Sequence, residues 1–305
     1  MAHSESRQLH GKTAVITGAS SGIGAEAAAR LAELGATVAV VARSPAKTAA
    51  VAQRVRGQAH TADYGRLDDV RRLAADLLAA YERIDILANN AGAIFTSRVI
   101  SADGHEMTFQ VNYLAPFLLT NLLLARLTAA PGGGRVISTG SNLYRRARLD
   151  LDDLDGSRQA YPASKLATIL FTRELARRTA GTGITAVAFH PGVVATDLGR
   201  GSPLFRLMNS WAGRIALSSP RRGAEPLLHL ATIGDPQAVN GTYFNRLKPE
   251  EPANEQARDP GLARRLWERS AALTGLELCR GERLRRPHRG KGSGVRHRSR
   301  SGASS

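Results

Sequence analysis

The sequence predicts an α/β fold: a doubly wound, mostly parallel sheet of seven strands with helices on both faces. Short apolar runs alternate with segments of helical periodicity along the chain, which is typical of parallel sheets. The run 36–42 is apolar throughout, as in a strand that is buried on both faces. The stretch Thr17–Gly24 lies between an apolar run and a helical pattern, which is the order of a phosphate-binding strand–turn–helix unit.

Each element follows from its own pattern. Apolar runs of strand length predict strands at 13–16, 36–42, 58–62, 84–88, 135–141, 184–189 and 241–244. Helical periodicity predicts helices at 25–32, from Ser44-Pro45 onward, and at 67–83, 107–127, 161–179 and 223–232. In such a sheet the crossovers are right-handed, and ligands bind beyond the carboxyl ends of the strands. We expect a single domain over residues 1–279.

The composition fits a reducing, aqueous compartment. With 305 residues and 43% apolar side chains, the chain can bury a large core. Cys279 is the single cysteine, so there is neither a disulfide framework nor a cysteine cluster, and we expect no metal site. The N-terminal segment is polar, unlike a signal peptide, and no apolar run reaches the roughly 18 residues of a membrane span. We therefore expect a cytoplasmic protein without a membrane span.

The net charge of +16 is concentrated at the C-terminus. Residues 280–305 contain nine Lys or Arg against one acid, which is half of that charge. Almost no apolar side chains occur there, so we expect this basic tail to be disordered. It could attract phosphate groups or acidic surfaces non-specifically, but it has no aromatic residues for base stacking, and we expect no specific nucleic-acid partner. A solvated tail without function is the simpler interpretation.

The glycine-rich turn is a candidate phosphate-binding site. Glycines permit a tight turn and a close backbone approach, so that amides at a helix N-terminus can meet a pyrophosphate. Gly18, Gly22 and Gly24 give the spacing Gly-x3-Gly-x-Gly, which differs from the general Gly-x-Gly-x2-Gly fingerprint. A glycine-rich turn without a ligand is the alternative interpretation of these residues alone.

A second candidate site combines Tyr161, Lys165 and Ser141. Tyr161 and Lys165 are four residues apart and therefore share a helical face. A phenol has a pKa near 10, and a nearby ammonium lowers that value, which suits a proton relay at neutral pH. Ser141, at the end of the fifth strand, can hydrogen-bond a substrate oxygen beside the tyrosine hydroxyl. An exposed Tyr–Lys pair is the alternative, but the glycine-rich turn and the strand-end Gly-Ser favour catalysis.

Together these motifs resemble the short-chain dehydrogenase/reductase family, and its retinol-dehydrogenase-like members in particular. The resemblance covers about residues 8–278. The motifs that carry it are Thr17-Gly18-x3-Gly22-x-Gly24, Asn89-Asn90-Ala91-Gly92, Asn112, Ser141, Tyr161-x3-Lys165 and Pro191-Gly192. The likeness to retinol dehydrogenases lies in segments 111–117, 164–167, 174–176, 190–196 and 241–244. The family implies a Rossmann-type fold and hydride transfer between a nicotinamide cofactor and a carbonyl or alcohol.

The resemblance implies a role for each catalytic residue. Tyr161 would be the general acid in reduction and the base in oxidation. Lys165 would lower the pKa of that tyrosine and bind the nicotinamide ribose. Ser141 would orient the carbonyl or alcohol oxygen, and Asn112 would support a proton-relay water through Lys165.

The family pattern also implies where the cofactor lies. With Arg43, the expected cofactor-binding residues are Gly18, Ser20, Ser21, Gly22, Ile23, Gly24, Asp63, Tyr64, Asn90, Ala91, Gly92, Tyr161, Lys165, Pro191, Gly192, Val194 and Thr196. The glycine turn would line the pyrophosphate and adenosine ribose, Asp63 and Tyr64 would flank the adenine, and Thr196 would meet the carboxamide. Plainer interpretations are a helix cap for Asp63, a turn residue for Asn90 and a surface hydroxyl for Thr196.

The second strand favours NADP(H) over NAD(H). An NAD site has an acid about 20 residues after the glycines, which accepts hydrogen bonds from the adenosine ribose. The strand here ends at Arg43-Ser44 without a carboxylate. The planar guanidinium of Arg43 suits a ribose 2′-phosphate, although a solvated arginine is the alternative.

Other features bear on the substrate. An insert from Arg145 to Gln159 lengthens the interval between Ser141 and Tyr161, as in the retinol-dehydrogenase-like members, whereas the basic tail matches nothing in the family. We expect no membrane anchor of the kind that several such members carry. The segment 198–219 contains many apolar residues and should cap the substrate pocket, so we expect a fairly hydrophobic carbonyl or alcohol substrate.

The competing interpretation is a non-catalytic NADP(H)-sensing or scaffold protein that binds a partner through the basic tail. The intact catalytic residues argue against it, because a sensor need not keep a proton relay. A related epimerase or dehydratase would have a different glycine spacing and a larger second domain. In the family, the helices expected at 107–127 and 161–179 are the usual dimer surfaces. The resemblance therefore implies a possible homo-oligomer.

Overall fold

The computed structural model describes residues 8–95, 97–154, 160–192 and 219–277. Val194, Thr196, nearly all of the expected substrate cap and the basic tail lie outside these described residues. The strands of the described chain are β1 (Thr13–Thr17), β2 (Thr37–Ala42), β3 (Gln58–Thr61), β4 (Ile86–Asn89), β5 (Arg135–Thr139), β6 (Thr185–His190), β7 (Tyr243–Asn245) and β8 (Lys248–Glu250). They form one sheet in the order β3-β2-β1-β4-β5-β6-β7-β8.

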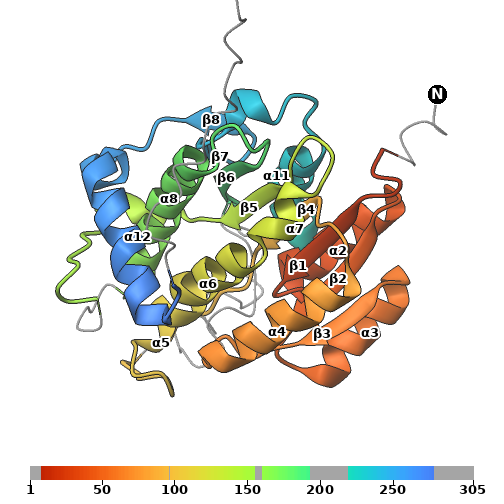
Figure 1. Cartoon of the computed structure of the whole chain (residues 1–305), viewed down its shortest axis with the longest axis horizontal. Helices are drawn as coiled ribbons and strands as arrows, with labels where there is room; N and C mark the ends of the chain where they lie inside the picture. Colours follow the sequence, from red (N-terminus) through yellow and green to blue (C-terminus); the bar gives the residue numbers. More distant parts are fainter. Residues whose placement is uncertain (1–7, 96, 155–159, 193–218, 278–305) are drawn as a thin grey trace, which may run out of the picture.

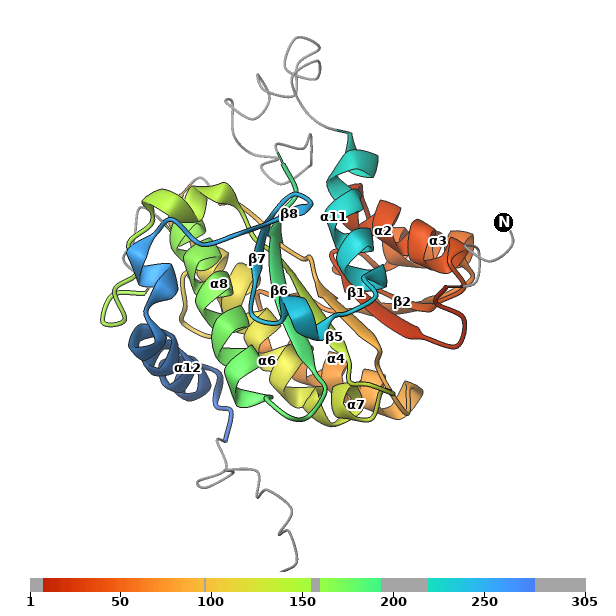
Figure 2. The same ribbon diagram turned by 90° about the horizontal axis from the view of Figure 1, so that it is seen from above.

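Helices cover both faces of the sheet, as the sequence predicts (Figures 1 and 2). One face carries α2 (Gly22–Glu33), α3 (Pro45–Val55) and α11 (Pro220–Thr232). The other carries α4 (Leu67–Ala80), α5 (Met107–Phe109), the π-helical turn η1 (Gln110–Leu114), α6 (Ala115–Leu122), α7 (Leu124–Thr128), α8 (Ala160–Arg178) and α12 (Pro260–Thr274). Short 3₁₀ turns are η2 (Asn142–Arg146), η4 (Gln237–Val239) and η5 (Glu255–Arg258).

The sheet has one strand more than the sequence predicts. The first seven strands are parallel, and β8 is antiparallel to β7 after the two-residue turn Arg246-Leu247. The residues of β8, Lys248-Pro249-Glu250, are polar or partly exposed at the edge of the sheet. A strand with no buried face carries no apolar alternation, which is why the pattern misses it.

The strand order places a ligand site at the sheet centre. The chain runs outward from β1 through β2 to β3, then returns to β4 on the other side of β1. At such a reversal the two neighbouring crossovers lie on opposite faces, which opens a crevice at the carboxyl ends of the strands. The glycine turn directly follows β1. The motif Asn89-Asn90-Ala91-Gly92 begins with the last residue of β4 and continues into the loop after it. Both predicted motifs therefore border this crevice.

The predicted helix at 107–127 is interrupted in the structure. Five residues form the π turn η1, in which Ala115 N donates to Gln110 O, and a second break occurs at Leu123 between α6 and α7. Pro116 accounts for part of this, because it has no N–H to donate to the carbonyl of Asn112 four residues earlier. The interruption therefore falls on a predicted catalytic residue.

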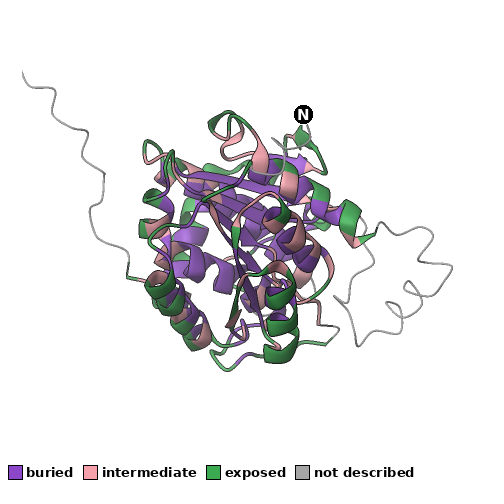
Figure 3. Ribbon diagram, turned by 90° about the vertical axis from the view of Figure 1, so that its right-hand side faces the viewer, coloured by how far each residue is buried: buried purple, intermediate pink, exposed green. Residues whose placement is uncertain are grey.

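The strands and the sides of the helices that face them are mostly buried, whereas the outer sides of the helices are exposed (Figure 3). The face of α4, α6, α8 and α12 contains an aromatic cluster, in which Trp267 stacks on Phe171 at 5.7 Å between ring centroids and meets Phe117 edge-on at 5.0 Å. The Arg178 guanidinium lies over the same indole at 4.7 Å. Helix α12, which the sequence analysis does not predict, thus packs on α6 and α8. None of the described helices is long and apolar enough to cross a bilayer.

Helix α12 is also joined to the rest of the chain by polar contacts. Tyr113 OH and Ser270 Oγ are 2.8 Å apart. At its C-terminal end, Arg71 donates to the carbonyl of Thr274, and a ring nitrogen of His105 lies 3.3 Å from the carbonyl of Leu273. Cationic or polar donors at a helix C-terminus satisfy carbonyls that lack helical partners. The end of the described chain is therefore fixed to η1 and α4.

We expect Trp267→Ala to destabilise the protein by about 3–5 kcal/mol, because it leaves a cavity between α12, α6 and α8. Urea unfolding followed by circular dichroism measures this loss. Arg264→Ala, at an exposed position of the same helix, is the matched control and should change stability by less than about 0.5 kcal/mol. Equal effects of the two substitutions would contradict the packing role of Trp267.

Candidate active site

The glycine turn requires glycine at two positions for steric reasons. Gly18 has a φ of +67°, and a Cβ there would lie 2.7 Å from the Cα of Ala91. A Cβ at Gly24 would lie 2.5 Å from the carbonyl oxygen of Gly18. Such contacts are too short for any side chain, so the glycines let the turn pack directly on the residues after β4.

The N-terminus of α2 is suited to an anion. The N-cap residue Ser21 makes no side-chain cap, and no acid occurs in the first turn. The first amides of a helix have no helical acceptor, and the helix dipole favours negative charge there. The predicted pyrophosphate site, which includes Ser20, Gly22 and Ile23, therefore has backbone donors to offer, and its residues fit a dinucleotide phosphate.

Thr17 fixes the two motifs to each other. Its hydroxyl donates to the carbonyl of Ala88 (3.1 Å) and accepts from the backbone N–H groups of Asn90 and Ala91, both at 3.0 Å. The Asn90 side chain donates back to the Thr17 carbonyl (3.0 Å) and accepts from the Thr139 hydroxyl (3.2 Å). Sequence analysis places Thr17 within the motif but gives it no role, whereas the structure makes it the contact between β1 and the loop after β4.

Asn112 connects that loop to α8. Its side-chain oxygen accepts from Ala93 N (2.8 Å), and its amide nitrogen donates to Ala93 O (3.0 Å) and to Ser164 Oγ (3.2 Å). A Cβ at Gly92 would lie 3.2 Å from the Asn112 oxygen and 3.9 Å from Lys165 Nζ. The predicted residues Gly92, Asn112 and Lys165 are therefore neighbours in space.

The electrostatics of Tyr161 differ from the expectation. Burial raises the pKa of the Tyr161 hydroxyl above its usual range, and a side-chain hydrogen bond with Ser141 partly opposes the rise. Lys165 Nζ lies 5.6 Å from the centre of the Tyr161 ring and donates to the carbonyl of Thr139 at 2.8 Å. The expected lowering of the tyrosine pKa by Lys165 is thus not found, because burial is the larger effect.

Lys165 itself is strongly affected by its surroundings. Its side chain is 4% exposed, and burial lowers its pKa from the usual 10.5 to about 8. The ammonium remains the main form at pH 7. A lysine with a pKa this close to neutrality can both carry a positive charge and pass on a proton.

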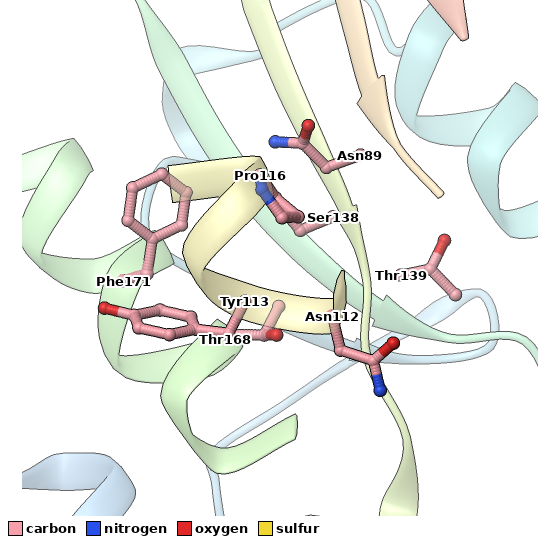
Figure 4. A pocket seen from close by; sticks show the side chains of 8 residues that line it. All are labelled: Asn89, Asn112, Tyr113, Pro116, Ser138, Thr139, Thr168 and Phe171. Carbon is pink, nitrogen blue, oxygen red and sulfur yellow. The ribbon is translucent and has the colours of Figure 1, made fainter. Parts of the chain in front are cut away.

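A small cavity of about 10 Å³ lies beside Asn112, one of the predicted catalytic residues (Figure 4). Polar groups of Asn89, Asn112 and Thr139 line it together with the apolar Pro116 and Phe171. A polar cavity of this volume accommodates one water molecule. The side-chain oxygen of Asn89 is buried here without a protein partner, so its surroundings suit a hydrogen-bonded water.

The remaining predicted cofactor residues differ in accessibility. Arg43 is exposed at the end of β2, and Lys47, which sequence analysis does not name, is exposed in the first turn of α3. Asp63 is half-buried and accepts from Gly65 N at 2.9 Å. The ring of Tyr64 is packed in the core at 6% exposure, so only its backbone could border an adenine.

Pro191 and Gly192 directly follow β6, at the same edge of the sheet as the predicted catalytic residues. Gly192 has a φ of +88°, a conformation that favours glycine. The predicted cofactor-binding residues and the predicted catalytic residues, where the structure describes them, therefore lie mostly at the carboxyl ends of β1, β4, β5 and β6.

This arrangement has known counterparts. The family model described as "short chain dehydrogenase" matches residues 12–204. The chain belongs to the short-chain dehydrogenase family.

Relatives in this family are named as a retinol dehydrogenase and as a ketoreductase. Human retinol dehydrogenase 13 is 40% identical over 287 residues, which cover 88% of this chain and 86% of that protein. A protein of Streptomyces sp. (strain C5), provisionally named daunorubicin C-13 ketoreductase DnrU, is 42% identical over 284 residues and covers 88% and 94% of the two chains.

Solved structures of similar proteins agree with the fold. An uncharacterised protein from Mycobacterium paratuberculosis has a TM-score of 0.71 with 34% identity and covers 88% of this chain and 94% of that one. A short-chain dehydrogenase from Burkholderia cenocepacia in complex with NADP has a TM-score of 0.64 with 29% identity, covering 83% and 100%.

In this short-chain dehydrogenase, the buried Lys165 should make stability depend on pH. Between its folded pKa of about 8 and the usual 10.5, the unfolded chain binds more protons than the folded one, so the free energy of unfolding rises with pH. Relative to Lys165→Met, we expect the wild-type value to rise by about 3 kcal/mol over this range. Urea unfolding of both proteins at several pH values measures the difference, and a constant difference would contradict the shifted pKa.

Proposed function

We propose that the protein is an NADP(H)-dependent oxidoreductase that interconverts a carbonyl compound and an alcohol. The observation that carries this proposal is the convergence of Ser141, Tyr161, Lys165 and Asn112 at the sheet edge beside the glycine turn. A proton donor, an oxygen-orienting hydroxyl and a cation next to a nucleotide-binding turn are the groups that carbonyl reduction requires.

In the reduction direction, Tyr161 and Ser141 would have different roles. The raised pKa of Tyr161 keeps its hydroxyl protonated at neutral pH, which is the form that donates a proton to the substrate oxygen. Ser141 would hold the same oxygen in place. When bound, the nicotinamide supplies the hydride.

Proton resupply would run through Lys165 and Asn112. Lys165, with a pKa of about 8, can return a proton to Tyr161 once its environment changes on cofactor binding. Pro116 leaves the Asn112 carbonyl without an α-helical donor, and the cavity lined by Asn112 and Thr139 suits the relay water. In the oxidation direction the same groups would remove the proton of the alcohol.

The cofactor preference rests on charge at the end of β2. Arg43 and Lys47 are exposed cations there, and no carboxylate follows β2 before α3. Two cations beside the adenosine ribose would favour a 2′-phosphate over a hydroxyl. The NADP complex of the similar Burkholderia enzyme is consistent with this preference.

Tyr161→Phe should lower kcat/KM for a carbonyl substrate at least about 100-fold, because it removes the proton donor. NADPH oxidation with a panel of aryl ketones and aldehydes measures this. Tyr81→Phe, whose hydroxyl donates only to Gln58, is the matched control and should retain activity. Undiminished turnover by Tyr161→Phe would refute the proposed mechanism.

Arg43→Gln should raise the KM for NADPH about 10-fold to 100-fold while leaving the KM for NADH nearly unchanged, because a charged hydrogen bond contributes about 1.5–3 kcal/mol. Initial-rate kinetics with both cofactors give the comparison. Arg54→Gln, an exposed substitution on α3, should alter neither value. A parallel change for both cofactors would argue against recognition of the 2′-phosphate.

A further inference from the structure

A chain of hydrogen bonds joins the catalytic-serine turn η2 to the β7–β8 hairpin. Tyr243 OH donates to Asn142 Oδ1 (2.9 Å), and Asn142 Nδ2 donates to Asn245 Oδ1 at 3.4 Å. Asn245 Nδ2 donates to Glu250 Oε2 (2.9 Å), and Glu250 forms an ion pair with Arg145 (2.6 Å). Neither the relay nor the expected cofactor contacts use any of these side chains.

The Tyr243 hydroxyl is a rigid anchor for the Asn142 amide. The Tyr243 side chain is 1% exposed and packs edge-on against Tyr144 with ring centroids 5.1 Å apart. A Cβ at Gly140 would lie 3.2 Å from this ring, so the ring sits directly behind the residue before Ser141. Burial raises the pKa of Tyr243 far above its usual range, so the hydroxyl stays a donor and must face the amide oxygen of Asn142.

The hydrogen-bonding capacity of Asn142 is incompletely used. A side-chain amide has two N–H donors. Within the described residues, one of them makes the long bond to Asn245, and the other has no protein acceptor. Asn142 is half-buried, and a partly buried donor that is held in one orientation is suited to a ligand acceptor.

Asn142 is the chain neighbour of the serine that we expect to hold the reacting oxygen. It directly follows Ser141, one peptide step of about 3.8 Å, and the Tyr243 hydroxyl that binds its amide is close enough to Tyr161 for the two phenols to interact electrostatically. Its partner Asn245 is paired with His190 in the parallel register of β6 and β7, and His190 immediately precedes Pro191. The amide is therefore joined, through Asn245, to the strand that neighbours the end of β6.

We propose that Asn142 is a substrate-binding residue, and that the enzyme takes ketones with a second oxygen on the neighbouring carbon, such as 1,2-diketones. Ser141 and Tyr161 would hold the oxygen that is reduced, and the Asn142 N–H would donate to the adjacent one. Tyr243 and Asn245 would be positioning residues that fix the amide. This inference rests on the carbonyl reduction proposed above and specifies its substrate class.

The test compares 1-phenyl-1,2-propanedione with propiophenone, which lacks the second oxygen, in NADPH-dependent reduction by the full-length enzyme. For Asn142→Leu, the ratio of kcat/KM for the diketone to that for propiophenone should fall about tenfold relative to wild type, which corresponds to one ordinary hydrogen bond. Tyr243→Phe, which frees the amide to rotate, should lower the ratio less and mainly through a higher KM for the diketone.

Tyr144→Phe is the matched control, because the Tyr144 hydroxyl accepts from Ala253 N and, within the described residues, forms no hydrogen bond with Asn142. It should leave the ratio unchanged. A wild-type ratio retained by both Asn142→Leu and Tyr243→Phe would overturn the role of Asn142 and leave carbonyl reduction standing. If wild-type enzyme reduces neither ketone, nor any carbonyl of the wider panel, the carbonyl reduction itself is refuted, and this substrate class with it.

Discussion

The hydroxyl of Thr17 joins β1 to the end of β4 at the centre of the sheet. Thr17 ends β1, and its side chain binds the backbone of Ala88, Asn90 and Ala91 at the point where the strand order reverses. Neighbouring groups of the site are connected to this contact: Gly18 packs on Ala91, and the loop continues to Asn112, which binds Ser164 of α8. A buried threonine with three bonds costs more to lose than a surface contact, because two amides would be left without an acceptor.

Burial, rather than the tyrosine–lysine pairing, sets the charge states of the site. Tyr161 and Lys165 are both shifted toward their neutral forms, since a low-dielectric surrounding disfavours any charge. A dinucleotide would bring a negatively charged phosphate and ribose hydroxyls into this space. The tyrosine of the site is therefore protonated, and a bound dinucleotide would supply the charge that tunes the pair.

Much of the fold and of the site was predictable because the deciding signals are local. The glycine turn, Tyr161-x3-Lys165 and the apolar run of β2 each lie within a few residues. Thr17 and Asn142 could not be assigned roles in this way, since their partners lie 71 and 101 residues further along the chain. The edge strand β8 lacks an apolar face, and the raised pKa of Tyr161 depends on burial that no spacing reveals.

The docking of α12 has a consequence for how the protein is made. Arg71 contacts Thr274 across 203 residues, and Tyr113, next to Asn112, contacts Ser270. During synthesis, the aromatic faces of α6 and α8 stay uncovered until α12 leaves the ribosome. Exposed apolar surface of this kind invites aggregation and chaperone binding. The π turn that contains Asn112 thus receives its packing partner only after α12 has been made, and chains that stop before α12 would hold Tyr113 without Ser270.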